Sequence, residues 1–135
     1  MGFLTNKVAM ITGAGRKKGL GAGIARRFAE EGAQVIITDI GTSTKNLLPS
    51  EHIGTLDEMK QVAELISSET NQRVDSVVCD VTSEESVCDA IDKIITSYQK
   101  IDIVVNNAGV GFIMKPLVDL TLEEWDIVLN VNLRG

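Results

Sequence analysis

Cysteine, proline, histidine and aromatic residues are scarce in this sequence of 135 residues. It contains two cysteines, two prolines, one tryptophan and a single histidine, His52. One histidine without a surrounding cluster of Cys, Asp and Glu cannot form a metal site, so we expect no metal centre. The two cysteines, Cys79 and Cys88, are too few for a disulfide framework. They predict free, partly buried thiols in a reducing compartment.

Long apolar runs and an excess of positive charge are also missing. The 13 basic residues are outnumbered by 19 acidic ones, which leaves a net charge of -6. This balance argues against nucleic acid or an anionic membrane as the main partner, because phosphate contacts need a basic face. No window approaches the ~20 apolar residues of a membrane span, and Met1-Gly2-Phe3-Leu4 lacks the features of a signal peptide. We therefore expect a cytoplasmic globular protein.

What the sequence does contain is an alternation of short apolar runs with amphipathic stretches. Residues 7–12, 34–39, 74–80 and 101–106 form nearly continuous apolar runs, which are typical of strands buried on both faces. Helical periodicity follows each run, with apolar stripes predicted at Ile24 and Phe28, at Met59, Val62, Ala63 and Ile66, and at Val87, Ile91, Ile94 and Ile95. The alternation predicts an α/β fold, a doubly wound parallel sheet with helices on both faces.

Helix ends carry their own signals. The four-residue runs that begin at Thr55, Thr82 and Thr121 match the capping-box pattern and predict three helix starts. Gly32 predicts the end of the first helix. Residues 41–55 show no clear periodicity and are long for a strand-to-helix connection. We expect them to form either an insertion with a function or a mobile cover.

A glycine-rich loop joins the first predicted strand to the first predicted helix. It reads Thr12-Gly13-Ala14-Gly15-Arg16-Lys17-Lys18-Gly19-Leu20-Gly21. Glycines allow a pyrophosphate to approach the backbone, and the helix N-terminus offers unpaired N–H groups. The next strand ends in Asp39, where dinucleotide-binding folds place an acid that binds the adenosine ribose. A flexible turn and an ordinary polar strand end are the alternatives, but the two features together favour a dinucleotide site.

Four ordered motifs resemble those of the short-chain dehydrogenases/reductases. They are Thr12-Gly13 with Gly19-Leu20-Gly21, then Cys79-Asp80-Val81, then Asn106-Asn107-Ala108-Gly109, then Asn130-Val131-Asn132-Leu133. The resemblance covers essentially the whole chain, and the Asn-Asn-Ala-Gly run is its most specific part. It implies a Rossmann fold with strand order 3-2-1-4-5-6-7, of which this chain supplies 3-2-1-4. The fold is then incomplete at the C-terminus, and the catalytic second half lies outside the 135 residues.

The resemblance also implies roles for individual residues. Gly13, Gly19, Leu20 and Gly21 would line the pyrophosphate, and Thr12 would brace this region. Asp39 would hold the ribose, and Asp80 with Val81 would hold the adenine. Asn107, Ala108 and Gly109 would run along the cofactor, while Asn106 would tie neighbouring strands together. Asn132 matches the asparagine of the family's Asn-Ser-Tyr-Lys tetrad, where it shapes a helix and holds a water of the proton relay.

Two departures from the family pattern are visible. Five residues separate Gly13 from Gly19 where the main branch has three, a spacing similar to that of the divergent enoyl-acyl-carrier reductases. Those reductases lack Asn-Asn-Ala-Gly, so the main branch fits better. The catalytic Ser and Tyr-x-x-x-Lys are absent, because the only tyrosine is Tyr98 and Asp102 stands four residues further on. We interpret Tyr98 as a packing residue at a helix end.

Two features compete over the choice between NAD and NADP. Asp39 would repel a 2′-phosphate, by on the order of 4 kcal/mol at about 4 Å and an effective dielectric near 20, as an upper figure. Lys18, with Arg16 and Lys17, could instead attract a phosphate, although a solvated basic loop tip is the commoner fate of such a run. Asp39 acts at shorter range and accepts the 2′-hydroxyl directly. We therefore favour NAD, with NADP as the alternative.

The function implied is the cofactor-binding part of an oxidoreductase that moves a hydride between a nicotinamide and a secondary alcohol or ketone. The alternative is a dinucleotide-binding fragment or module without turnover. Expected partners are the small-molecule substrate and either further copies of the chain or a complementary C-terminal chain. In isolation, the fourth strand would leave Ile103-Val104-Val105 as an apolar edge. We expect such a segment to be marginally stable or to associate.

Overall fold

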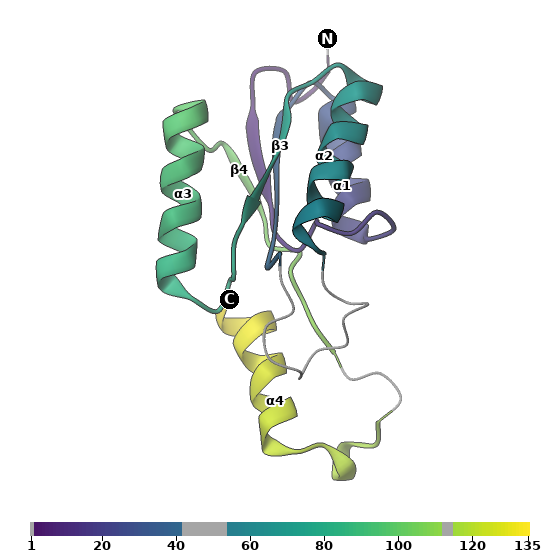
Figure 1. Ribbon diagram of the computed structural model, residues 1–135, viewed down its shortest axis with the longest axis vertical. Coiled ribbons are helices and arrows are strands. Elements are labelled where there is room, and N and C mark those ends of the chain that lie inside the picture. Colours follow the sequence, from purple (N-terminus) through teal and green to yellow (C-terminus); the bar gives the residue numbers. More distant parts are fainter. Residues whose placement is uncertain (1, 42–53, 112–114) are drawn as a thin grey trace.

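The computed structural model describes residues 2–41, 54–111 and 115–135. Helices and strands alternate along the described chain (Figure 1). Their order is β1 (Val8–Ile11), α1 (Leu20–Glu30), β2 (Gln34–Asp39), α2 (Leu56–Thr70), β3 (Val74–Val78), α3 (Glu84–Tyr98), β4 (Ile103–Val105), a 3-10 helix (Leu117–Asp119), α4 (Leu122–Leu129) and a π-helix (Asn130–Arg134).

The four strands form one parallel sheet in the order β3-β2-β1-β4. Ala9 of β1 pairs with Val35 of β2 on one side and with Ile103 of β4 on the other. All four residues of β1 and the inner four of β2 are buried, as expected for central strands covered on both faces. The parallel α/β fold and the 3-2-1-4 strand order are therefore confirmed. The β4 edge is open, and 52% of Val104 is exposed.

Helices cover both faces of the sheet. Figure 1 shows α1 and α2 on one side and α3 on the other, while α4 lies beyond the carboxyl ends of the strands. All four residues of the predicted α2 stripe are buried: Val62, Ala63 and Ile66 belong to the first core, and Met59 is 1% exposed. The second core, under α3, contains Ala90 and Ile94, with Val87 and Ile91 partly buried against it. Ile95 was predicted to face inward, but 42% of it is exposed.

The three predicted capping boxes have different outcomes. At α4 the box is complete, because Thr121 and Glu124 each bond the other's backbone N–H. At α2 the Thr55 side chain accepts from the Glu58 N–H, which is the forward half of the motif. At α3 the prediction was wrong, since Ser83 rather than Thr82 is the N-cap. The Thr82 hydroxyl and N–H instead both donate to Asp80 Oδ1, at 2.7 and 2.9 Å.

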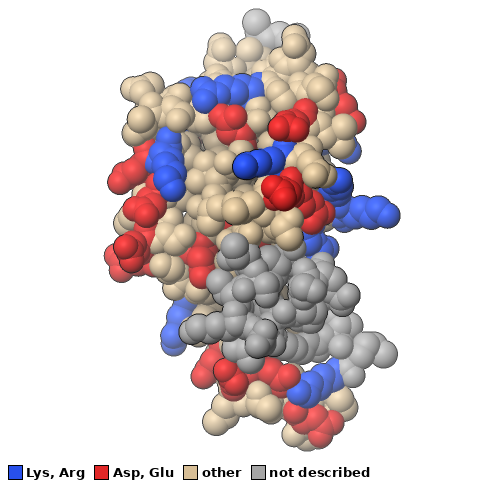
Figure 2. Space-filling model, viewed as in Figure 1, with Lys and Arg blue, Asp and Glu red and all other residues tan. Residues whose placement is uncertain are grey.

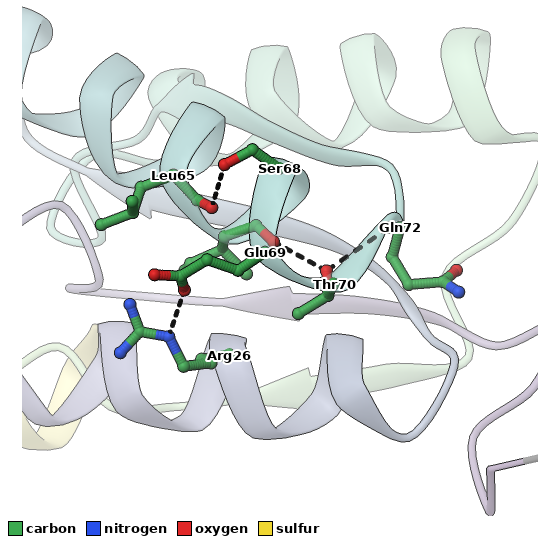
Figure 3. A network of polar contacts seen from close by, with 7 residues as sticks. Arg26, Leu65, Ser68, Glu69, Thr70 and Gln72 are labelled. Atoms are coloured by element: carbon green, nitrogen blue, oxygen red, sulfur yellow. Dashed lines mark hydrogen bonds and ion pairs between the residues drawn. The ribbon is translucent and has the colours of Figure 1, made fainter.

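A surface network joins the C-terminal ends of α1 and α2 (Figure 3). Arg26 Nε donates to Glu69 Oε2 at 2.8 Å, and Thr70 Oγ1 donates to the Ile66 carbonyl at 2.7 Å. Both ion-pair partners are close to half exposed, so the pair contributes at most about 1 kcal/mol. The burial of the two helices against the sheet, rather than this network, holds them in place.

Gly32 ends α1 in the way predicted. Its φ is +93°, its N–H donates to the Ala29 carbonyl, and the Ala33 N–H donates to the Phe28 carbonyl. These two bonds make a Schellman motif, with Glu31 as the C-cap. A Cβ on Gly32 would also lie 3.0 Å from Thr5 Oγ1.

We expect Gly32→Ala to lower the free energy of unfolding by roughly 1–2 kcal/mol, because alanine is strained in the left-handed region. Gly23→Ala is the matched control, since Gly23 lies inside α1 and a Cβ there would meet nothing within 4 Å. That control should raise stability by roughly 0.5–1 kcal/mol. Urea denaturation followed by circular dichroism compares the two. Equal stabilities for both variants would contradict the strain assigned to Gly32.

Candidate functional site

A cleft of about 480 Å³ opens at the carboxyl ends of the strands, where doubly wound sheets bind their ligands. Segments from both halves of the sheet meet there, and the π-helix closes one side. The lining residues come from the loop after β1, the ends of β2 and β3, the segment after β4, and the π-helix. They are Gly13, Arg16, Gly19, Leu20, Asp39, Ile40, Cys79, Asp80, Val81, Asn107, Ala108, Gly109, Val110, Gly111, Val131 and Asn132.

Thr12 lies behind the cleft wall and joins the β1 loop to the β4 loop. The residue is 5% exposed, and its Oγ1 accepts from the N–H groups of Asn107 at 3.1 Å and Ala108 at 3.0 Å. In return, Asn107 Nδ2 donates to the carbonyls of Thr12 at 2.8 Å and Gly13 at 3.0 Å. Four hydrogen bonds thus join the two loops, three of them to Thr12 and one to Gly13. Asn106 is exposed directly after β4, and its expected role of tying neighbouring strands together stays a prediction.

The glycine loop is packed too closely for side chains where it meets the segment after β4. Gly13 has a φ of +64°, and a Cβ there would lie 2.6 Å from Ala108 Cα. A Cβ on Gly21 would lie 2.7 Å from Asn107 Nδ2. Gly21 is buried behind the wall, whereas Gly13 and Gly19 face the cleft. These glycines let the two loops touch and leave backbone at the cleft surface.

The three basic residues of the glycine loop differ in whether they line the cleft. Gly19 is the N-cap of α1 and offers no side-chain cap, so the first N–H groups of the helix are available to an anion. Arg16 lines the cleft, while Lys17 and Lys18 are exposed and outside its lining. Lys18, which the sequence placed beside the cofactor, is therefore not brought into the cleft. Arg16 takes the place expected of Lys18 on the cleft wall.

Asp39 ends β2 at the cleft wall and is held by backbone groups. Its Oδ2 accepts from the Gly15 N–H at 2.9 Å and its Oδ1 from the Ile40 N–H at 2.8 Å. The backbone of Gly54 also favours the charged form of this carboxylate. Burial raises the pKa of Asp39 above its usual value, although these hydrogen bonds and the nearby charge of Arg16 act in the opposite direction. The side chain is oriented before any ligand arrives.

Asp80 and Cys79 follow β3 at the far end of the cleft. Asp80 Oδ1 is occupied by Thr82, and the Asp80 N–H donates to Ser86 Oγ at 2.9 Å. Asp80 itself lines the cleft. Cys79 is buried and its thiol has a raised pKa, first because of burial and then because of Asp80. Cys88 is exposed rather than partly buried as expected.

Asn132 joins the π-helix to the segment that follows β4. Its Oδ1 accepts from the Val110 N–H at 2.8 Å, and its Nδ2 donates to the Val110 carbonyl at 2.9 Å. The side-chain oxygen and nitrogen of Asn132 thus both bond the backbone of Val110, which lies 22 positions earlier in the sequence. Within the described chain, the π-helical widening occurs only at Asn130–Arg134, and such widenings are frequent at functional sites.

Tyr98 lies away from the cleft. Its ring packs against the core under α3, its hydroxyl donates to Asp75 Oδ2 at 2.5 Å, and the Arg73 guanidinium lies 4.0 Å from the ring centroid. Burial, followed by the bond to Asp75, raises the pKa of Tyr98 above its usual range. These contacts confirm that Tyr98 is a packing residue at a helix end.

The structure therefore brings most of the predicted site residues together. Ten of them line the cleft: Gly13, Gly19, Leu20, Asp39, Asp80, Val81, Asn107, Ala108, Gly109 and Asn132. Thr12 and Gly21 support it from behind, and Lys18 lies outside it. The site assignment omitted Arg16, Ile40, Cys79, Val110, Gly111 and Val131, which also line the cleft. Four of them, Ile40, Cys79, Val110 and Val131, are direct sequence neighbours of predicted site residues, so sequence adjacency could have identified them. Arg16 and Gly111 have no such neighbour.

The described residues contain neither a cluster of metal ligands nor a helix that could span a membrane. Among them, no group of three or more His, Cys, Asp or Glu side chains could hold a metal ion. His52 and residues 42–53 of the long predicted connection lie outside the described part. No helix in that part is long and apolar enough to cross a bilayer. On the face shown in Figure 2, acidic and basic side chains are interspersed rather than gathered by sign.

Comparison with known proteins places the chain in a family. A family model described as enoyl-(acyl carrier protein) reductase matches residues 13–135. The 3-oxoacyl-acyl-carrier-protein reductase of Thermotoga maritima is 37% identical over 132 residues, which cover 98% of this chain and 46% of that protein. Its similarity extends over the whole of the described fold.

Solved structures agree with this assignment. Carveol dehydrogenase from Mycobacterium avium, in complex with NAD, has 32% identity and a TM-score of 0.83, covering 98% of this chain and 46% of that one. A metagenomic short-chain oxidoreductase in complex with NADP has 29% identity and a TM-score of 0.76, covering 96% and 51%. The chain spans about half the length of the curated relatives it matches. It belongs to the short-chain dehydrogenase/reductase family.

Proposed function

We propose that this chain is the cofactor-binding part of an NAD-dependent oxidoreductase that interconverts secondary alcohols and ketones. Residues 1–135 would form the N-terminal portion of an NAD(P)-binding domain, and the catalytic second half would lie in residues beyond them or in a complementary chain. The observation that carries the proposal is the cleft itself. A glycine-lined helix N-terminus and an oriented Asp39 carboxylate face the same cavity at the carboxyl ends of the strands.

The residues of the cleft fit a dinucleotide in order. Gly13, Gly19 and Leu20 would hold the pyrophosphate at the start of α1, supported by Gly21 from behind. Asp39 would accept from the ribose hydroxyls, and Asp80 with Val81 would hold the adenine. Asn107, Ala108 and Gly109 would run along the cofactor on a segment that Thr12 anchors. Lys18 could approach a bound phosphate only from outside the cleft wall. The bound nicotinamide would supply or accept the hydride.

Asn132 is proposed to act by position in this reaction. Its side-chain amide is used by Val110, so it orients the π-helix and the cofactor-side segment relative to one another. We propose that this arrangement places the residue for the proton relay that its family motif implies. The tyrosine and lysine of that relay would come from outside the 135 residues.

Asp39 is proposed to select NAD over NADP, with NADP as the alternative that Arg16 in the cleft favours. We expect Asp39→Asn to weaken NADH binding about tenfold, because a charge-assisted hydrogen bond to the 2′-hydroxyl becomes a neutral one. NADPH binding should strengthen, because like-charge repulsion of the 2′-phosphate is removed. Fluorescence titration of both nucleotides measures the two dissociation constants.

The matched control is Asp89→Asn, which makes the same charge change at an exposed position of α3. It should leave both dissociation constants within about twofold, since charges further apart than ~10 Å are screened at 0.1 M salt. Tighter binding of NADPH than of NADH by the unsubstituted protein would overturn the choice of NAD. A failure to bind either nucleotide would overturn the proposed function.

A dinucleotide-binding fragment or module without turnover is the second candidate, because the predicted site residues that line the cleft are, apart from Asn132, cofactor-binding ones. Binding and turnover separate the two functions. A protein that contains this chain and oxidises secondary alcohols with NAD supports the oxidoreductase. Nucleotide binding with no turnover across a panel of secondary alcohols and ketones supports the module.

We also propose a cytoplasmic protein that assembles with copies of itself or with a complementary chain. Several large apolar side chains on the 3-10 helix, α4 and the π-helix support assembly, because patches of this kind usually mark interaction surfaces. They are Leu117, Val118, Leu122 and Leu133, each at least two-thirds exposed. Sedimentation velocity with and without charged substitutions at Val118 and Leu122 tests this part of the proposal.

A further inference from the structure

Residues 54–58, which we call the return segment, lie against the glycine loop and the end of β2. The chain leaves the sheet at Gly41 and comes back beside it, since Gly41 and Thr55 form a parallel bridge and the Leu56 N–H donates to the Gly41 carbonyl at 3.2 Å. The return segment therefore begins next to Asp39 in space, although 15 positions separate Asp39 from Gly54 in the sequence.

The return segment contacts the glycine loop at two separate points. Gly54 is buried against the Gly15 backbone so closely that a Cβ on Gly54 would lie 2.7 Å from the Gly15 carbonyl carbon. Four residues on, the Glu58 N–H donates to the Thr55 side chain, and Glu58 Oε1 accepts from the Lys17 N–H at 2.9 Å. One contact is steric and the other is a hydrogen bond, and both act on the backbone between Gly13 and Gly19.

Gly15 transmits this contact to Asp39. A Cβ on Gly15 would lie 2.7 Å from Asp39 Cβ and 2.6 Å from Met59 Cγ, so Gly15 fills the space between the return segment and the β2 end. The Gly15 N–H donates to Asp39 Oδ2 at 2.9 Å. Gly15 does not have a positive φ. The requirement for glycine here is therefore one of space, not of backbone conformation.

We propose that the return segment, through Gly54 and Glu58, determines the discrimination between NADH and NADPH by holding the glycine loop against the Asp39 carboxylate. This inference rests on the proposed function, because it assumes that Asp39 accepts from the adenosine ribose. A carboxylate held by the N–H groups of Gly15 and Ile40 keeps one orientation, and Asp39 lines the cleft. An alanine at position 54 must displace Gly15, and with it the oxygen that the ribose would meet.

The test compares NADH and NADPH dissociation constants for Gly54→Ala, Glu58→Ala and the Gly23→Ala control. Gly54→Ala should weaken NADH binding by about tenfold or more, the size expected when a hydrogen bond to a charged group is lost. NADPH gains nothing from that hydrogen bond, so the NADPH dissociation constant should change by less than about threefold. The ratio of the NADPH dissociation constant to the NADH dissociation constant should therefore fall. Gly23→Ala should leave the ratio unchanged.

This ratio separates a change in the position of Asp39 from a general loosening of the cleft, because loosening would weaken the binding of both nucleotides equally. Glu58→Ala keeps the test decisive if Gly54→Ala does not fold, because Glu58 is at the surface and its loss releases only the Lys17 N–H. It should lower the ratio in the same direction by a smaller factor. Equal weakening of both nucleotides, or an unchanged ratio in every folded variant, would overturn the inference alone. No NADH binding by the unsubstituted protein would overturn the proposed function, and this inference with it.

Discussion

Replacing Gly13 with alanine is expected to abolish detectable NADH binding and to destabilise the fold. Gly13 has a φ of +64°, which costs an L-residue roughly 1–2 kcal/mol. A Cβ would also lie 2.6 Å from Ala108 Cα, a backbone atom that cannot rotate away. Adding the strain of overpacking, we expect the free energy of unfolding to fall by roughly 2–5 kcal/mol.

Binding should be lost because the displaced segment forms the cleft wall. Moving Ala108 away from Gly13 pulls on Asn107, whose Nδ2 bonds both the Thr12 and Gly13 carbonyls. Urea denaturation and NADH titration measure the two effects, and Gly23→Ala again provides a glycine-to-alanine change in open space. A Gly13→Ala protein with unchanged NADH affinity would show that the contact between the two loops is unimportant for the cleft.

The sheet could be predicted from the sequence because its central strands are buried on both faces. Short continuous apolar runs such as Val35-Ile36-Ile37, separated by helical stretches, are typical of the central strands of a parallel sheet. Strand order followed from the family resemblance, and the pairing of Ala9 with both Val35 and Ile103 confirms it. The α2 stripe was correct because its helix has one buried face. The prediction at Ile95 failed because α3 covers less of the sheet than the stripe suggested.

Local patterns failed where a nearby side chain offered a competing hydrogen bond. Thr82 has the sequence of an N-cap, but the Asp80 carboxylate accepts from both its N–H and its hydroxyl. The cap therefore moves one residue on, to Ser83. A capping box is judged from four consecutive residues, so an acid two positions before it is not considered. The short side chain of Asp80 makes such a turn favourable.

Contacts between distant segments were beyond the reach of sequence patterns. The pairing of Asn132 with Val110 and the contact of Gly54 with Gly15 each join segments that no periodicity relates. The same applies to the basic run, where spacing alone could not show that Arg16 lines the cleft and Lys18 does not. The family resemblance identified the residues of the site, while the structure supplied the interactions that orient them.

Thr12→Val is expected to destabilise the protein by roughly 2–4 kcal/mol, because two N–H groups lose their acceptor at a site with little access to water. Valine has nearly the same shape as threonine, so the change removes the hydroxyl without opening a cavity. The hydroxyl accepts from Asn107 and Ala108 and lies 3.4 Å from the Val105 carbonyl, to which it donates. Since Thr12 is 5% exposed, solvent cannot readily replace these bonds.

Thr12→Ser separates the hydrogen bonds from the packing. Serine keeps the hydroxyl and loses one methyl group, so its cost should be about 1 kcal/mol. NADH affinity should follow the same order, with a loss of about tenfold in Thr12→Val and little change in Thr12→Ser, because the segment along the cofactor is held by the hydroxyl. Urea denaturation and NADH titration of both variants decide the matter. If valine proved as well tolerated as serine, the hydroxyl would not be what joins the β1 loop to the β4 loop, and the cleft wall would depend on Asn107 alone.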